Sequence, residues 1–319
     1  MARIGKGMTR RGAMLLLGVA FSLAAARLPA EEVVGTLDAV GSDTLAGLML
    51  RWGERLAERH PGVRLQLQAS GSASAPAALT AGTTRLGPMS RPMSETEHEA
   101  FVARHGYPPL ELEIGRDALA VIVHRHNPLE TLSRRELDAI FSESRRCGGD
   151  APVERWRQLG VTLPGDRIVL HGRNVASGTH DLFRQLALCG GNYRVRLNEH
   201  PGSAAVVAAV AAEPSAIGFA GLNHLNAGVK ALRRLDPDGE AAAPTPEAVR
   251  RGEYSLARSL YLYVNLPPGG TLPEPERAFL ALVFSPAGQA VVEELGFVTL
   301  SAASLAQQRA RLAALPAAE

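Results

Sequence analysis

From Val33 onward, short apolar runs typical of strands alternate along the chain with longer amphipathic segments typical of helices. Residues 63–68 alternate strictly between apolar and polar, which indicates a half-buried strand, whereas 118–123 is the continuous apolar run of a fully buried one. The expected strands are 33–39, 63–68, 118–123, 168–170 and 260–264, and the expected helices include 44–59, 72–80 and 179–188. This alternation predicts an α/β protein.

The length of the chain indicates two domains, but the sequence contains no long flexible linker. Its 319 residues are 46% hydrophobic and 21% charged, which is enough for two globular cores. A chain that needs two cores and lacks a linker suggests that one domain is built from both ends of the sequence.

Residues 1–30 have the features of a signal peptide. A basic segment precedes the apolar stretch 13–26, which is shorter than a membrane span, and cleavage is expected after Ala26 or Ala30. Removing residues 1–30 takes away five of the 34 basic side chains and none of the 32 acidic ones. The formal net charge changes from +2 to −3, so a basic nucleic-acid surface is not supported.

Each of the two cysteines, Cys147 and Cys189, is followed by Gly-Gly in an expected loop. An exported protein folds in an oxidising compartment, so we predict a disulfide between them. No His or Cys lies at metal-ligand spacing from either cysteine, and His124 and His126 have no third ligand nearby. We therefore expect no metal site and no cofactor.

Residues 171–181 combine an arginine with a Ser-Gly-Thr at the start of an expected helix. The first N–H groups of a helix have no partner within the helix and carry partial positive charge. Ser177 and Thr179 add hydroxyl donors, Gly178 allows close approach to the backbone, and Arg173 can form paired hydrogen bonds to an oxyanion. The segment predicts an anion-binding site, although alone it would be an ordinary helix cap.

Three further segments have a similar composition. Thr44 and the amide of Leu45 lie at a second expected helix start, and Ser72 lies at a third. Arg91 lies in a proline-flanked loop before the helix that begins near Ser94. Ligands of open α/β sheets bind at the carboxyl ends of the strands, so we expect these segments to converge on one anion.

These segments resemble those of the phosphate-binding proteins that serve bacterial phosphate ABC transporters, a family of type II periplasmic binding proteins. The resemblance extends from Val33 to about Val298. Its most specific motifs are Gly-Ser-Asp-Thr-Leu (41–45), Ser-Gly-Ser (70–72), Met-Ser-Arg-Pro-Met-Ser (89–94), Gly-Arg-Asp-Ala-Leu-Ala-Val-Ile-Val (115–123), Arg-Asn-Val-Ala-Ser-Gly-Thr-His (173–180), Ala-Ile-Gly-Phe-Ala-Gly (216–221) and Arg-Ser-Leu-Tyr-Leu-Tyr-Val-Asn (258–265).

The resemblance implies two α/β lobes, each a mixed sheet flanked by helices, with the ligand in the cleft between them. Segments 118–123 and 259–264 would be the two strands that cross between the lobes. The expected boundaries are 31–119 with 259–319 for lobe 1 and 120–258 for lobe 2. This organisation accounts for the missing linker.

The resemblance also implies phosphate as the ligand and a membrane permease as the partner of a periplasmic protein, which we expect to be a monomer. The implied ligand-binding residues are Thr44, Leu45 and Ser72 from lobe 1, with Arg173, Ser177, Gly178 and Thr179 from lobe 2. We add the loop arginine Arg91 to this expected set.

Two positions depart from the family pattern. Well-known members have Ser-Asp where this chain has Ser90-Arg91, and that aspartate accepts a hydrogen bond from the protonated oxygen of phosphate; one branch of the family has Ser-Arg. Asp43 and Asp117 are then the candidate acceptors, and Ser42 and Ser90 are further candidate site residues. The second departure is Asn174, where close relatives often have an aspartate beside the arginine.

Several alternatives remain open at this stage. The anion could be sulfate or molybdate, and an exported binding protein could serve sensing or adhesion. Ser177, His180 and Asp181 are the residue types of a hydrolase triad, but residues this close on one helix start point in divergent directions. The chain also has no Gly-x-Ser-x-Gly motif, so we do not expect an enzyme.

Overall fold

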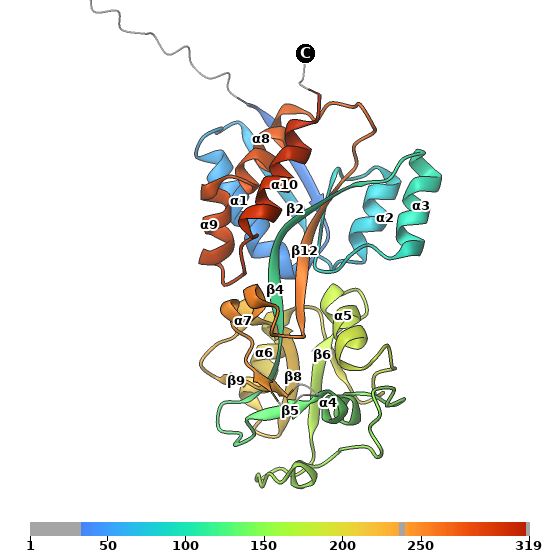
Figure 1. Ribbon diagram of the computed structural model, residues 1–319, viewed down its shortest axis with the longest axis vertical. Helices are drawn as coiled ribbons and strands as arrows, with labels where there is room; N and C mark the ends of the chain where they lie inside the picture. Colours follow the sequence, from blue (N-terminus) through green and yellow to red (C-terminus); the bar gives the residue numbers. More distant parts are fainter. Residues whose placement is uncertain (1–32, 236–239, 317–319) are drawn as a thin grey trace, which may run out of the picture. The chain divides into compact units, whose positions relative to one another are not determined.

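The fold is organised around β4 (Leu110–His124), a 15-residue strand that belongs to both halves of the sheet. In the computed structural model, which describes residues 33–235 and 240–316, β4 pairs antiparallel with β12 (Ala257–Val264) along 110–118. Along 119–123 it pairs instead with β8 (Ala216–Gly221). Figure 1 shows β4 and β12 connecting the two lobes.

The sheet of lobe 1 has the strand order β2-β1-β3-β12-β4. Its further strands are β1 (Gly35–Val40), β2 (Val63–Gln68) and β3 (Leu86–Met89). Its helices are α1 (Ala46–Ala57), α2 (Ser74–Ala81), α3 (Glu95–His105), α8 (Glu274–Val283), α9 (Pro286–Glu294) and α10 (Ala302–Ala313). Trp52 of α1 is buried in the core, packs edge-on against Phe279 and donates its indole N–H to the Gly288 carbonyl. Segments from both ends of the chain therefore share this core.

The sheet of lobe 2 continues from β4 in the order β8-β6-β7, and β9 also pairs with β4. Its remaining strands are β6 (Val169–Arg173), β7 (Asn198–His200) and β9 (Val229–Ala231), with a small sheet of β5 (Thr131–Ser133), β10 (Arg233–Leu235) and β11 (Ala241–Ala242). Its α-helices are α4 (Arg134–Phe141), α5 (Gly178–Ala187), α6 (Ser203–Ala212) and α7 (Pro246–Arg251). Phe183 of α5 stacks on Phe219 of β8 with ring centroids 4.0 Å apart, which anchors α5 on the sheet.

Short 3₁₀ turns complete the described fold at η1 (Asp43–Leu45), η2 (Trp156–Leu159) and η3 (Leu222–His224). The first of these modifies a predicted element. The expected helix 44–59 begins as η1 and becomes α-helical only at Ala46. This tighter turn at the end of β1 sets the direction of the Thr44 side chain.

The fold confirms the α/β prediction and extends one of the expected strands. The apolar run 118–123 is the lobe 2 end of β4, whose other end pairs with β12 in lobe 1. The predicted signal peptide, residues 1–30, lies outside the described residues. Within the described part of the chain, no helix is long and apolar enough to span a membrane.

The predicted disulfide is present. Cys147, in the loop after α4, is bonded to Cys189, at the end of α5, with a Cα–Cα separation of 5.4 Å. It closes a loop between residues 42 apart in sequence, all within lobe 2.

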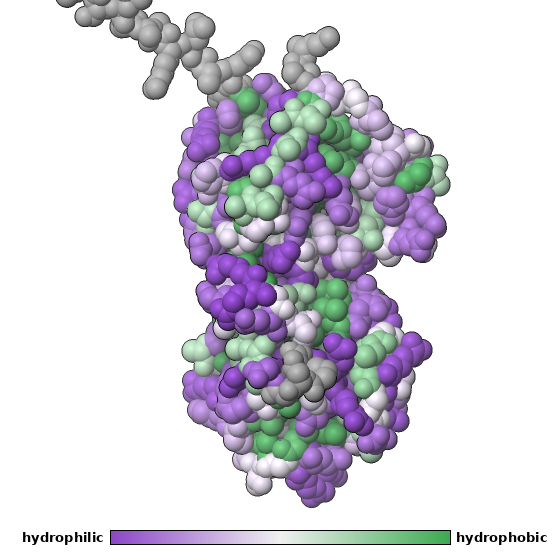
Figure 2. All heavy atoms as spheres, viewed as in Figure 1, coloured by the Kyte–Doolittle hydropathy of each residue, from purple (hydrophilic) through white to green (hydrophobic). Residues whose placement is uncertain are grey.

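On the face drawn in Figure 2, hydrophobic residues form separate small areas among hydrophilic ones over both lobes.

Candidate functional site

Two predicted anion-binding turns meet between the lobes. Ser177 is the N-cap of α5, and its hydroxyl accepts a hydrogen bond from the Thr179 N–H at 3.1 Å. Thr44 of η1 reaches the same point from lobe 1, so the Thr44 and Thr179 hydroxyls lie 3.3 Å apart and are both buried. These residues are 135 positions apart in sequence, and the fold brings them together.

Gly178 lies directly against two serines of lobe 1. The Ser72 and Ser90 hydroxyls are 3.2 Å apart, and the Ser90 N–H donates to Ser72 Oγ at 3.0 Å. A Cβ atom at position 178 would lie 2.5 Å from Ser72 Oγ and 2.8 Å from Ser90 Oγ. A side chain at this position would therefore force the two serines to move. The atoms that approach Gly178 here belong to the protein, so the expected approach of a ligand stays a prediction.

Arg258 of β12 is the cation at the centre of this group. It donates from Nη1 to Thr179 Oγ1 at 2.8 Å and from Nη2 to Thr44 Oγ1 at 3.5 Å. Its Nε and Nη2 also donate to Asp117 Oδ2 at 3.0 and 2.6 Å. Arg258 and Asp117 face each other in the β12–β4 register, so the pairing of the crossing strands directly sets this ion pair.

Arg258 is not among the predicted site residues, although the pattern of β12 contains a signal for it. Arg258 alternates with Leu260 and Leu262 on the buried face of the strand. A basic side chain on a buried face needs a carboxylate partner, because an unpaired buried charge is costly. Asp117, one of the predicted candidates, is that partner.

Arg173 lies at the end of β6 with its side chain 1% exposed. Its Nη1 donates to Ser203 Oγ at 2.9 Å, its Nη2 donates to the Pro201 carbonyl at 2.7 Å, and its Nη1 lies 3.1 Å from Asp43 Oδ2. Burial lowers the pKa of Arg173, Asp43 opposes that effect, and the nearby Arg258 adds to it. Among the described residues, Arg173 Nε has no hydrogen-bond partner.

Ser42 and Leu45 hold the η1 turn in place. The Leu45 N–H donates to the Ser42 carbonyl at 3.2 Å, and the Ser42 N–H donates to the Pro88 carbonyl at 2.8 Å. Both residues are buried. The first of these hydrogen bonds closes the η1 turn, and the second attaches the turn to β3.

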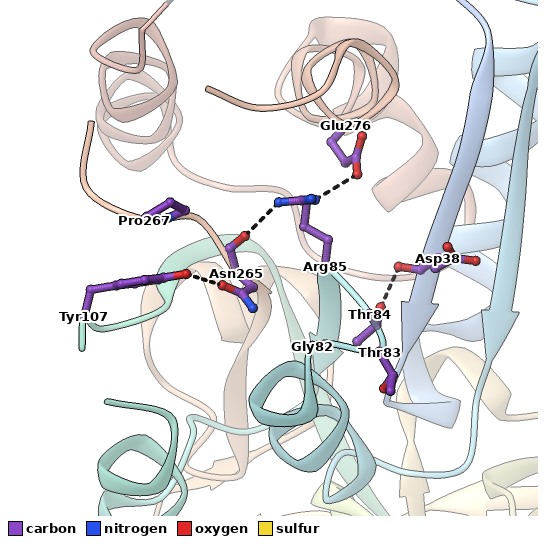
Figure 3. Close-up of a pocket in the computed structure, with 9 residues that line it drawn as sticks. All are labelled: Asp38, Gly82, Thr83, Thr84, Arg85, Tyr107, Asn265, Pro267 and Glu276. Atoms are coloured by element: carbon purple, nitrogen blue, oxygen red, sulfur yellow. Dashed lines mark hydrogen bonds and ion pairs between the residues drawn. The ribbon is translucent and has the colours of Figure 1, made fainter. Parts of the chain in front are cut away.

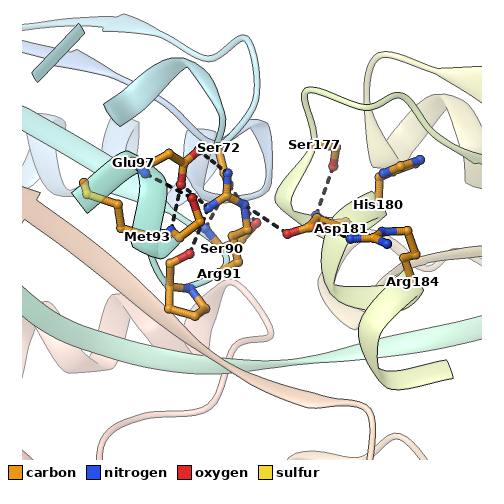
Figure 4. Close-up of polar contacts among 12 residues, drawn as sticks. Ser72, Ser90, Arg91, Met93, Glu97, Ser177, His180, Asp181 and Arg184 are labelled. Atoms are coloured by element: carbon orange, nitrogen blue, oxygen red, sulfur yellow. Dashed lines mark hydrogen bonds and ion pairs between the residues drawn. The ribbon is translucent and has the colours of Figure 1, made fainter. Parts of the chain in front are cut away.

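Arg91 belongs to a different group, at the rim between the lobes (Figure 4). It donates from both Nη atoms to the Glu97 carboxylate at 2.7 Å, and its Nε lies 3.6 Å from Asp181 Oδ2 of α5. Burial alone would lower the pKa of Arg91, but its bonds to Glu97 outweigh burial and raise it. Its recorded side-chain partners, Glu97 and Asp181, are separate from the Thr44, Thr179 and Arg258 contacts.

The three triad-type residues of α5 do not form a relay. Ser177 Oγ accepts from the Thr179 N–H, the Asp181 carboxylate lies near Arg91 and Arg184, and the His180 ring packs on Tyr193 with centroids 4.5 Å apart. Figure 4 shows these side chains diverging from the helix start. Within the described residues, no hydrogen bond joins Ser177 to His180.

A separate polar cavity of about 350 Å³ lies in lobe 1 (Figure 3). Arg85, Asn265 and Glu276 are among its lining residues, and Arg85 Nε lies 3.3 Å from Glu276 Oε1. Arg85 immediately precedes β3, whereas Ser90 immediately follows it. The cavity is therefore at the opposite end of the strand from the site, and it contains none of the predicted site residues.

Known proteins share much of this sequence. A family model described as a PBP superfamily domain matches residues 29–291. The phosphate-binding protein PstS of Pseudomonas aeruginosa is 44% identical over 278 residues, covering 86% of this chain and 85% of that protein. Protein SphX of Synechococcus elongatus is 27% identical and covers 92% and 86% of the two chains.

Two solved structures share the fold. One is described as a phosphate ABC transporter substrate-binding protein with bound phosphate, from Clostridium perfringens; its TM-score is 0.71 at 23% identity, covering 84% of this chain and 100% of that one. The other is an ABC-type phosphate transport receptor from Vibrio cholerae, with a TM-score of 0.65, 21% identity and coverage of 83% and 100%. By its domain match and its identity to the Pseudomonas protein, the chain belongs to the PBP superfamily and, within it, to the PstS family of phosphate-binding proteins.

Proposed function

We propose that this chain is an exported substrate-binding protein that takes up inorganic phosphate between its two lobes for an ABC transporter. The observation that carries the proposal is the convergence of hydroxyl donors from both lobes on one buried guanidinium. Thr44 and Thr179 are each within 3.5 Å of Arg258, and Gly178 lies against Ser72 and Ser90. The names of the relatives, which are phosphate-binding and phosphate-transport proteins, support phosphate as the ligand.

The charges of the site favour phosphate over an anion that carries no proton. Arg173 and Arg258 are balanced by Asp43 and Asp117, so the binding of an anion would depend on directed donors rather than on net charge. A fixed carboxylate stabilises a ligand O–H group and repels an oxyanion without one. Asp43 and Asp117 are the two candidates for this role.

The proposal includes the organisation of the chain. Residues 31–119 and 259–319 would form lobe 1 and 120–258 lobe 2, after removal of a signal peptide during export to the periplasm. Ligand-bound protein, with the lobes together, would be the form that a membrane permease recognises. We propose that the mature protein acts as a monomer without metal or cofactor and without catalysis.

Isothermal titration of the mature protein with phosphate, arsenate, sulfate and molybdate tests the proposal. We expect phosphate to bind at micromolar concentration and sulfate to bind far more weakly. Absence of phosphate binding at this concentration would overturn the proposal. Tight sulfate or molybdate binding would instead assign the protein to another oxyanion, and release of product from a phosphate ester would indicate a hydrolase.

Two sets of variants locate the site. Arg173→Ala removes a buried charge-assisted donor, which should cost about 2–4 kcal/mol of anion binding. Asp43→Asn and Asp117→Asn should each be compared for the ratio of phosphate to sulfate affinity. The variant in which that ratio falls identifies the acceptor of the ligand proton, and unchanged affinity in Arg173→Ala would show that the site is elsewhere.

A further inference from the structure

The Asp43 carboxylate extends from lobe 1 to the start of α6 in lobe 2. Its Oδ2 lies 3.1 Å from Arg173 Nη1 and accepts from the Ser203 N–H at 3.4 Å. A Cβ atom at Gly202, the N-cap of α6, would lie 3.4 Å from Asp43 Oδ1. The carboxylate thus lies at the positive end of a ten-residue helix and beside a guanidinium, and both come from the other lobe.

The partners that lobe 2 gives to the Arg173 guanidinium are neutral. Within this lobe the guanidinium donates to the Ser203 hydroxyl and to the Pro201 carbonyl, and its Nε has no acceptor among the described residues. A buried cation is stable only when its charge is compensated. Asp43 is the carboxylate that opposes the lowering of the pKa of Arg173, which burial and Arg258 both favour.

We propose that Asp43 is a positioning residue, which orients and neutralises the anion-binding Arg173 of the other lobe when the two lobes are together. The inference rests on the proposed function, because it assigns a role within the same site. Lobe 1 then supplies the carboxylate that Arg173 does not receive from lobe 2. The orientation of Arg173 for anion binding therefore depends on closure of the lobes. Asp43 immediately precedes Thr44, so the same contact also brings the Thr44 hydroxyl to Thr179.

Replacing Asp43 has two opposite effects on anion affinity. Removing a negative charge near the ligand favours anion binding through the Coulomb interaction. Loss of the contact to Arg173 and Ser203 disfavours the closed arrangement and therefore binding. The proposal requires the second effect to dominate, which gives the experiment a clear sign.

The test compares Asp43→Asn, which keeps the size of the side chain, with wild type by phosphate titration and stopped-flow release. We expect affinity to fall at least about tenfold, mainly through faster release, because the contact stabilises the closed state. The matched control is Asp181→Asn, which removes another interlobe carboxylate whose partner Arg91 keeps Glu97. The control should change affinity by less than about threefold.

A double-mutant cycle establishes whether Asp43 acts through Arg173. In an Arg173→Gln background, measured by NMR titration at millimolar phosphate, Asp43→Asn should change affinity by less than about twofold. A full tenfold effect in that background would overturn the inference, as would equal or tighter phosphate binding by Asp43→Asn alone. Failure of the wild type to bind phosphate would instead overturn the proposed function, and this inference with it.

Discussion

The centre and the rim of the contact between the lobes each contain an arginine held by a carboxylate, but the two pairs lie in different surroundings. At the centre, Arg258 and Asp117 are 2.6 Å apart, and their side chains are 2% and 0% exposed. At the rim, Arg91 is held by Glu97 and approaches Asp181, which is 40% exposed, at 3.6 Å. The central pair joins two crossing strands, whereas the Arg91–Asp181 contact joins a buried arginine of lobe 1 to an exposed carboxylate in the first turn of α5.

This difference in burial shows why similar ion pairs should contribute differently to folding stability and to ligand binding. A buried charge that loses its partner cannot be compensated by water, whereas an exposed one is readily solvated and screened by salt. The central arginine is also shared with the Thr44 and Thr179 hydroxyls, so its position bears on the ligand. The rim contact can contribute to closure but has little influence on folding.

The largest effect is expected for Asp117→Ala. It leaves Arg258 buried without its carboxylate, which should lower the free energy of unfolding by about 3–5 kcal/mol. Urea denaturation of the ligand-free protein measures this. The corresponding rim variant, Asp181→Asn, should leave the midpoint nearly unchanged, and equal losses in the two variants would contradict the distinction between centre and rim.

Gly178→Ala should weaken anion binding without weakening the fold. The new Cβ would lie 2.5 Å from Ser72 Oγ, so the lobes could not approach as closely, at a cost of about 1–3 kcal/mol. Titration with phosphate measures the loss. Gly47→Ala is the control, because a Cβ at position 47 has no neighbour within 4 Å, and affinity there should not change. A similar loss in both variants would exclude a specific contact at Gly178.

His180 lies between the two regions, next to Thr179 on one side and Asp181 on the other. Burial lowers its pKa from 6.5 to about 4, so the folded protein holds the ring neutral while the unfolded chain takes up a proton first. The contribution to stability is complete above about pH 6.5 and is lost as the pH falls towards 4. His180→Phe should therefore retain more of its neutral-pH stability at about pH 5 than wild type does.

Urea midpoints at about pH 7.5 and about pH 5 provide the measurement for His180→Phe. His171→Phe is the comparison variant, because burial also lowers the pKa of His171. An equal loss of stability on acidification in wild type and His180→Phe would show that this ring does not contribute to the pH dependence.

The smallest effect is expected for Asp181→Asn on anion binding. A partly exposed ion pair contributes about 0.2–1 kcal/mol, and salt should reduce the difference further. Titrations at about 50 and about 500 mM NaCl test this. A loss of binding free energy above about 2 kcal/mol that persists in high salt would show that the rim contact contributes as a buried ion pair does.

Local sequence was sufficient for several of the elements and for some of the turns that cap them. Strand 63–68 lies at its predicted position because strict alternation specifies a half-buried strand. Ser177-Gly178-Thr179 begins α5 as expected, because an N-cap hydroxyl and a helix start are short-range features. The cysteine pair was also predictable, from composition and compartment.

The partners of the charged groups were decided by tertiary structure. Arg258 meets Thr44 from 214 positions away only because β12 and β4 cross the lobes in one register. Asp43 likewise reaches Arg173 only because the η1 turn packs against the end of β6 and the start of α6. The Arg91–Glu97 pair differs, because its two residues are only six positions apart. Periodicity and capping are properties of neighbouring residues, whereas the choice of partner for a buried charge depends on which distant surfaces the hydrophobic cores bring together.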